Sequence, residues 1–261
     1  MKLSLVIAFS AVVLVANARG ASYVSNFDSF DDQLDVAGND GWGINDPTVG
    51  LSFIVSLNGT NAAALGGYYA NPAPTTQTVG LTHSYVEELG ATSMSFDFLL
   101  VDQTNTASFR DTFGVTLRNG ASDLFKVSFA PVPLVPPESD HKWGLSYSVG
   151  NGPTVSLTMA VFEAGLYSLN LQFTPHGSTT DFNLSIGGGN TVVRTGNIAI
   201  DPTTVATDFG LTWTPTGGAG NGSNNYFVMD NLAVERIPEV SSSLLLCLAG
   251  LGAVFRRRRT C

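Results

Sequence analysis

Residues 19–236 contain no cysteine, because Cys247 and Cys261 both lie near the C-terminus of the 261-residue chain. This absence excludes disulfides, cysteine-based zinc sites and cysteine nucleophiles from that segment. Basic residues are also scarce: the segment has 7 Lys+Arg and 20 Asp+Glu, a formal charge of −13, whereas the whole chain carries −9. Proteins that bind nucleic acid need a basic surface, so the composition excludes that class.

A sustained helical period is missing from residues 19–236 as well. Apolar residues instead alternate with polar ones at a spacing of two, for example along Met94–Leu100 and Tyr167–Phe173, which is typical of strands with one buried face. Asn119-Gly120 and Gly150–Pro153 supply turn signals between such segments. The pattern predicts about a dozen strands in one all-β domain over residues 19–236, an antiparallel β-sandwich of the jelly-roll kind.

The usual catalytic motifs are absent too. The three histidines lack metal-ligand spacing, and there is no Gly-x-Ser-x-Gly turn. Glycoside hydrolysis uses two carboxylates across a cleft, and no strand segment carries a matching acidic run. We therefore expect a protein that is not an enzyme. The alternative is a jelly-roll glycosidase or polysaccharide lyase whose carboxylates meet only in the folded chain.

Asp230 interrupts an apolar strand pattern. Alternation along Tyr226–Val234 predicts that it shares a face with Tyr226, Val228, Leu232 and Val234. A carboxylate on an apolar face needs partners, because burying an unpaired charge is costly. A calcium ion or a set of backbone N–H groups would each serve.

The Asp230-Asn231 pair before alternating aliphatics, together with Asn26-Phe27-Asp28 near the start of the segment, resembles carbohydrate-binding jelly rolls and the concanavalin-A-like sandwiches. In those folds, acids of the first and last strands can share a structural calcium ion. The resemblance therefore implies Asp28 and Asp230 as calcium ligands. The alternative is a hydrogen-bonded carboxylate at the edge of a sheet.

Exposed aromatic rings are candidates for stacking on sugars. Trp213 follows the buried period of Phe209 and Leu211, so we expect it in the core. Trp42 and Trp143 stand beside glycines in loop-like segments. They are the two residues predicted to be exposed and to stack on a carbohydrate.

The N-terminus has the three parts of a secretory signal peptide. Met1-Lys2 is followed by the apolar stretch Leu3–Val15 and by Ala16-Asn17-Ala18. We predict a signal peptide over residues 1–18 that is cleaved after Ala18. An uncleaved anchor is the alternative, but the apolar stretch is short for a membrane span of about 20 residues.

Residues 237–261 form a second terminal signal. Pro238-Glu239 is followed by a serine-rich spacer and by the small and apolar residues Leu244–Phe255, which predict a short hydrophobic helix. Such a helix inserts weakly in the inner membrane, and basic residues hold its end on the cytoplasmic side. The basic residues are Arg256, Arg257, Arg258 and Arg259.

This order of Pro-Glu, spacer, helix and arginine cluster resembles the PEP-CTERM protein-sorting family, also called the ice-binding-protein C-terminal domain. The resemblance implies an exported bacterial protein that an exosortase processes near the Pro-Glu motif and delivers to the cell surface or extracellular matrix. Val240 stands where the family has its second proline. A permanent single-pass anchor is the alternative.

Together these features predict an exported cell-surface or matrix protein with a structural or carbohydrate-binding role. Its expected partners are an exosortase-type enzyme, polysaccharide, and the inner membrane through the tail. The remaining alternatives are the glycosidase or lyase described above and an anchored adhesin that binds protein partners.

Overall fold

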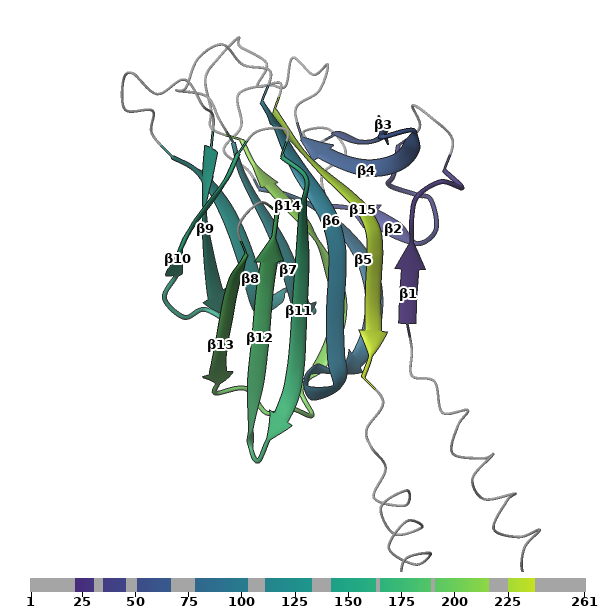
Figure 1. Ribbon diagram of the computed structural model, residues 1–261. Coiled ribbons are helices and arrows are strands. Elements are labelled where there is room, and N and C mark those ends of the chain that lie inside the picture. Colours follow the sequence, from purple (N-terminus) through teal and green to yellow (C-terminus); the bar gives the residue numbers. More distant parts are fainter. Residues whose placement is uncertain are drawn as a thin grey trace, which may run out of the picture.

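The computed structural model describes residues 22–30, 35–45, 51–66, 78–102, 111–132, 142–162, 165–188, 191–215 and 225–237. In these ranges the protein is all-β apart from one 3-10 turn at Leu89–Ala91. Two antiparallel sheets face each other (Figure 1), which confirms the predicted β-sandwich. The predicted signal peptide, residues 1–18, lies outside the described ranges, as do Pro238, Glu239 and the four arginines of the tail.

The strands are β1 (Ser22–Ser25), β2 (Trp42–Ile44), β3 (Leu51–Leu57), β4 (Thr60–Gly66), β5 (Val79–Glu88), β6 (Thr92–Asp102), β7 (Thr112–Asn119), β8 (Ser122–Pro131), β9 (Lys142–Val149), β10 (Val155–Phe162), β11 (Tyr167–His176), β12 (Thr179–Gly187), β13 (Val192–Ile198), β14 (Val205–Thr214) and β15 (Asn225–Arg236).

Sheet A has the order β13-β12-β11-β6-β15-β4-β3, with β1 as a further neighbour of β15, and sheet B has the order β10-β9-β8-β7-β14-β5-β2. Two hairpins of sheet B turn where the sequence predicted. Gly120 has a φ of 55° between β7 and β8, and Gly150 has a φ of 52° after β9. Glycine favours these turns because it adopts positive φ without a Cβ clash.

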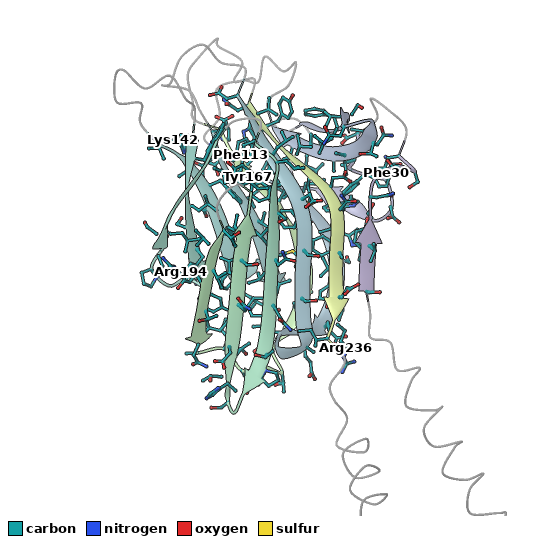
Figure 2. The ribbon with its side chains drawn as sticks, viewed as in Figure 1. Phe30, Phe113, Lys142, Tyr167, Arg194 and Arg236 are labelled. Atoms are coloured by element: carbon teal, nitrogen blue, oxygen red, sulfur yellow. The ribbon has the colours of Figure 1, made fainter. Side chains whose placement is uncertain are left out.

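One core fills the space between the sheets. Phe98 of β6 stacks on Phe227 of β15 with ring centroids 5.4 Å apart, and both rings approach Phe129 of β8 in the opposite sheet. Figure 2 labels Phe113 and Tyr167, which enter this layer from sheets B and A. Each such ring contributes about 1.5–3 kcal/mol through burial. The core therefore holds the backbone of each sheet in place, so that the outward side chains of sheet A form a stable surface.

Strand β15 pairs with three neighbours. It runs beside β6 on one edge, while its other edge pairs first with β4, from Tyr226 to Met229, and then with β1, from Leu232 to Glu235. Ser22 is paired with Glu235, so β1 begins beside the end of β15 (Figure 1). The described body therefore starts and finishes at the same end of sheet A.

Within the described ranges, the structure contains no helix with the length and apolar character that a membrane crossing requires.

Candidate functional site

A β-bulge in β15 sets the orientation of Asp230. Asp230 pairs with Asp97 of β6, but Ala233 pairs with Ser95, so β15 has one residue more than β6 in this interval. Asn231 lies in the extra space with a φ of 52°. This left-handed conformation is one that asparagine tolerates better than most residues, and it is typical of a bulge.

Because of the bulge, Asp230 shares a face with only some of the residues that alternation predicted. Val228 packs on the outer side of sheet A, and Asp230 follows it on that side, whereas Leu232 and Val234 point into the core between the sheets. The prediction that Asp230 shares a face with Leu232 and Val234 is therefore wrong. The extra residue at Asn231 reverses the in-and-out order of every residue after it.

The structure brings Asp28 and Asp230 to one junction, where β1 and β4 follow each other along β15. Thr60 Oγ1 donates a hydrogen bond to Asp230 Oδ2 at 3.4 Å, and the adjacent Asn61 N–H donates to Asp28 Oδ1 at 3.0 Å. The Asn231 N–H donates to Asp230 Oδ1 at 2.7 Å. The two acids are thus joined through neighbouring residues of β4.

Burial raises the pKa of Asp230 above its ordinary value. The side chain is only 5% exposed, which penalises its charged form. The hydrogen bonds from Asn231 and Thr60 act in the opposite direction, while the negative charges of Asp28 and Asp97 raise the pKa further. Protonation of Asp230 therefore relieves both desolvation and repulsion at this junction.

A calcium ion takes about six to eight oxygen ligands. Among the described residues, no group of three or more His, Cys, Asp or Glu side chains is placed to hold a metal ion. The oxygens of Asp28 and Asp230 instead accept hydrogen bonds from neighbouring N–H and O–H groups. These residues fit the hydrogen-bonded alternative better than a calcium site, and a metal role for Asp28 and Asp230 stays a prediction.

Trp42 and Trp143 are buried, with exposed fractions of 2% and 0%, so their predicted exposure is wrong. The segments beside the glycines are strands β2 and β9, and their tryptophans face the core. Trp42 Nε1 donates to the hydroxyl of Tyr23 at 3.0 Å, and Trp143 Nε1 donates to the backbone oxygen of Asp111 at 3.1 Å. A sugar cannot stack on either ring in this structure.

Trp213 lies in the core as predicted, with no exposed surface. It has a partner that the sequence did not reveal, because its Nε1 donates to Asp111 Oδ2 at 2.8 Å. Asp111 is itself fully buried, immediately before β7. The register of β7 and β14 pairs Thr112 with Thr214. The side chains of Asp111, next to Thr112, and of Trp213, next to Thr214, therefore lie close together.

The outer face of sheet A carries a row of hydroxyl, amide and carboxyl side chains that are paired across six strands. We call this row the polar ladder; in spatial order it consists of Ser22 (β1), Glu235 (β15), Ser93 (β6), Gln172 (β11), Asn183 (β12) and Thr195 (β13). Neighbouring strands lie about 4.8 Å apart, so the ladder extends over about 24 Å.

The polar ladder faces away from the core because its residues alternate with core residues. Leu171 and Phe173, on either side of Gln172, are buried between the sheets. Gln172, Asn183 and Thr195 are exposed, and within the described part of the chain no hydrogen bond is formed by their side chains. Their amide and hydroxyl groups are therefore available to a ligand that displaces water.

The far end of the polar ladder borders a hollow of about 420 Å³, lined by Gln172, Thr174, Asp181, Phe182, Asn183, Thr195 and Gly196. Asp181 supplies the carboxylate of this lining. Its Oδ1 accepts a hydrogen bond from Asn197 Nδ2 at 2.7 Å, and its Oδ2 lies 2.9 Å from His176 Nδ1. The hydrogen bond from Asn197, followed by that from His176, lowers the pKa of Asp181, which is therefore ionised at neutral pH.

A second hollow, of about 500 Å³, lies on sheet B and is lined in part by Arg118, Thr207 and Asp208. Several of its polar groups already have partners in the protein: Thr207 Oγ1 donates to Asp208 Oδ2 at 2.8 Å, and Arg118 forms an ion pair with Asp123, outside the lining, at 3.2 Å. Ser93 Oγ of the polar ladder donates to the Glu235 backbone oxygen at 3.5 Å, but the side chains of Gln172, Asn183 and Thr195 are exposed and are not bonded to one another, so the polar ladder is the better candidate site.

The sequence pattern did not predict the polar ladder, although it did predict which face of each strand is polar. Ser168, Asn170 and Gln172 are the polar partners of the alternation that predicted a strand at Tyr167–Phe173. The alternation reports which face is polar, but it does not report which strands become neighbours.

No protein-family model matches the chain, and no curated protein matches it. Among solved structures, it is similar to the lectin of Bauhinia forficata in complex with GalNAc (TM-score 0.49, 12% identity, 82% of this chain and 97% of that chain). It is also similar to lectin II of Ulex europaeus (TM-score 0.48, 10% identity, 84% and 100%). The CBM2 module of the evolved Dit protein of a Lactobacillus casei phage is a further match (TM-score 0.48, 11% identity, 84% and 98%). At these scores the similarities carry no argument about a ligand.

Proposed function

We propose that this chain is an exported bacterial protein of the cell surface or extracellular matrix that binds polysaccharide on the outer face of sheet A. The polar ladder is the single observation that carries the proposal. It presents six polar side chains in one row, and its far end borders a hollow that can hold part of a sugar chain.

The chemistry of the polar ladder suits a carbohydrate. Sugar hydroxyls both donate and accept hydrogen bonds, and so do the amides of Gln172 and Asn183 and the hydroxyl of Thr195. A row of about 24 Å favours an extended chain over a single sugar, because each strand adds a polar contact at a regular spacing. Binding would run across the strands rather than along them.

The hollow supports binding rather than cleavage. Its described lining contains one carboxylate, Asp181, whereas glycoside hydrolysis requires two across the scissile bond. Asp97 and Asp230 lie on the same face, but they are engaged with Asn231 through its side chain and backbone respectively. This geometry favours the carbohydrate-binding role over the glycosidase or lyase.

The sorting part of the proposal rests on the terminal segments. A signal peptide would export the chain, and an exosortase would process the tail at Pro238-Glu239 and release the body to the surface or matrix. The body is suited to attachment at one end, because Ser22 and Glu235 are paired neighbours. Mass spectrometry of the mature protein tests this: a C-terminus that still extends through Cys261 would replace sorting with permanent anchoring.

A glycan array followed by affinity measurements on the mature protein tests the binding role. The triple variant Gln172→Ala, Asn183→Ala, Thr195→Ala removes three polar groups at about 0.5–1.5 kcal/mol each, so binding should weaken by about 10-fold to about 2,000-fold. The matched control is Ser128→Ala, Ser146→Ala, Ser156→Ala on paired positions of sheet B. No binding to any glycan, or equal loss in both triple variants, would refute the proposal.

A further inference from the structure

We infer that the polar ladder selects uncharged polysaccharides and discriminates against acidic ones, such as polymers of uronic acids or sulfated sugars. This inference rests on the proposed binding role and names the substrate class of the same surface. It is carried by the distribution of charge over the two sheets.

Among the described Lys, Arg, Asp and Glu side chains, those on the outer face of sheet A are acidic, and His176 of β11 contacts one of them, Asp181, at 2.9 Å. Glu235 belongs to the polar ladder and is exposed, and Asp181 lines the hollow. Asp97 is paired with Ser168 of β11, so it lies in a parallel row of the same face. A polyanion laid across these strands therefore meets carboxylates near both ends of the ladder.

The basic residues of the described ranges lie elsewhere. Arg118, Lys126 and Lys142 belong to strands of sheet B. Arg194 and Arg236 are on ladder strands, but each is adjacent in sequence to a ladder residue and therefore takes the opposite side of its strand. Figure 2 labels both, with Arg236 at the end of β15.

Arg236 is also engaged with the other sheet. Its guanidinium lies 3.6 Å from Glu87 Oε2 of β5. Arg194 is paired in register with Leu184, a core residue, which fixes its position on the inward side of β13. The described lysines and arginines therefore lie off the face that carries the polar ladder. On that face, His176 lies 2.9 Å from Asp181 and offsets its charge only when the imidazole is protonated.

Electrostatic screening sets the conditions for the test. The screening length is about 8 Å at physiological ionic strength and about 3 Å at 1 M salt. Repulsion between an acidic polymer and Glu235 or Asp181 should therefore be strong at low salt and nearly absent at 1 M salt. Hydrogen bonding to a neutral polymer should change little over the same range.

The experiment compares neutral and acidic polymers in pairs by affinity electrophoresis and calorimetry. The pairs are hydroxyethylcellulose with carboxymethylcellulose, galactomannan with alginate, and dextran with dextran sulfate. The mature protein should bind the neutral member of at least one pair about tenfold more tightly than the acidic member at low salt, and 1 M NaCl should close most of that gap.

The double variant Asp181→Asn, Glu235→Gln should reduce the ratio of the affinity for the neutral polymer to the affinity for the acidic polymer. The control Asp123→Asn, Asp208→Asn removes the same amount of charge from sheet B and should leave the ratio unchanged. This comparison separates a local effect from the overall charge of the protein.

The outcomes distinguish this inference from the proposed function. If an acidic polymer binds as tightly as its neutral partner at low salt, the selectivity is wrong while polysaccharide binding stands. If both double variants shift the ratio equally, the polar ladder is not the cause of the selectivity. If no polymer of any pair binds and the glycan array is also negative, the proposed function fails and the inference fails with it.

Discussion

Replacement of Asn231 by alanine tests the bulge that orients Asp230. Asn231 has a φ of 52°, and its side-chain Nδ2 donates to Asp97 Oδ2 at 2.9 Å. Alanine in the left-handed region costs about 1 kcal/mol, and the lost hydrogen bond costs about 1 kcal/mol more. We expect Asn231→Ala to lower the free energy of unfolding by about 2 kcal/mol.

A domain of this size loses about 2–4 °C in Tm for each kcal/mol, so Asn231→Ala should melt about 4–8 °C below the wild type in calorimetry. Asn231→Gly loses the same hydrogen bond but adopts positive φ freely, so its Tm should fall by about half as much. Asn170→Ala, on an exposed and extended position of β11, is the control and should change the free energy of unfolding by less than about 0.5 kcal/mol.

The order of stability among the variants tests whether the bulge requires the left-handed backbone at Asn231. The expected order of stability is wild type, then Asn231→Gly, then Asn231→Ala. An alanine variant that melts with the wild type, or a glycine variant that melts below the alanine variant, would show that the left-handed backbone at Asn231 is not what the bulge requires.

Three further perturbations test the buried polar groups. Trp213→Phe removes the N–H that bonds the buried Asp111 carboxylate and should cost about 1.5–3 kcal/mol in urea unfolding, and an unchanged midpoint would contradict this role. Because the folded-state pKa of Asp230 is raised, the folded protein binds more protons than the unfolded chain between the ordinary and the raised pKa, so stability should fall as pH rises through that window. Asp230→Asn should remove this slope, and a slope that persists would assign it to another group. Finally, if Asp28 and Asp230 hold no metal, the Tm should be the same in calcium chloride and in EDTA. A higher Tm in calcium chloride would support the alternative that these two residues bind calcium.

Much of the fold could be predicted because burial in a strand follows a local rule. Met94, Phe96, Phe98 and Leu100 all lie in the core between the sheets, as alternation predicted. The same rule failed at Asn231, because a bulge depends on the pairing of β15 with β6 and has no signal in the period itself. It also gave no help with Trp42 and Trp143, since neighbouring glycines predicted loops where the chain forms strands of sheet B.

By itself, the sequence determined the all-β class and the cysteine-free and acidic character of the body, and it supplied the two terminal segments on which the proposed export and sorting rest. These are properties of composition and short-range order, so they need no knowledge of the fold. Only the tertiary structure decided that Thr60 reaches Asp230, 170 positions away, and that six strands place Ser22 and Thr195 at the two ends of one polar row. The physical reason is register: the hydrogen bonds between strands determine which distant residues become neighbours, and hydrophobic period alone does not specify that pairing.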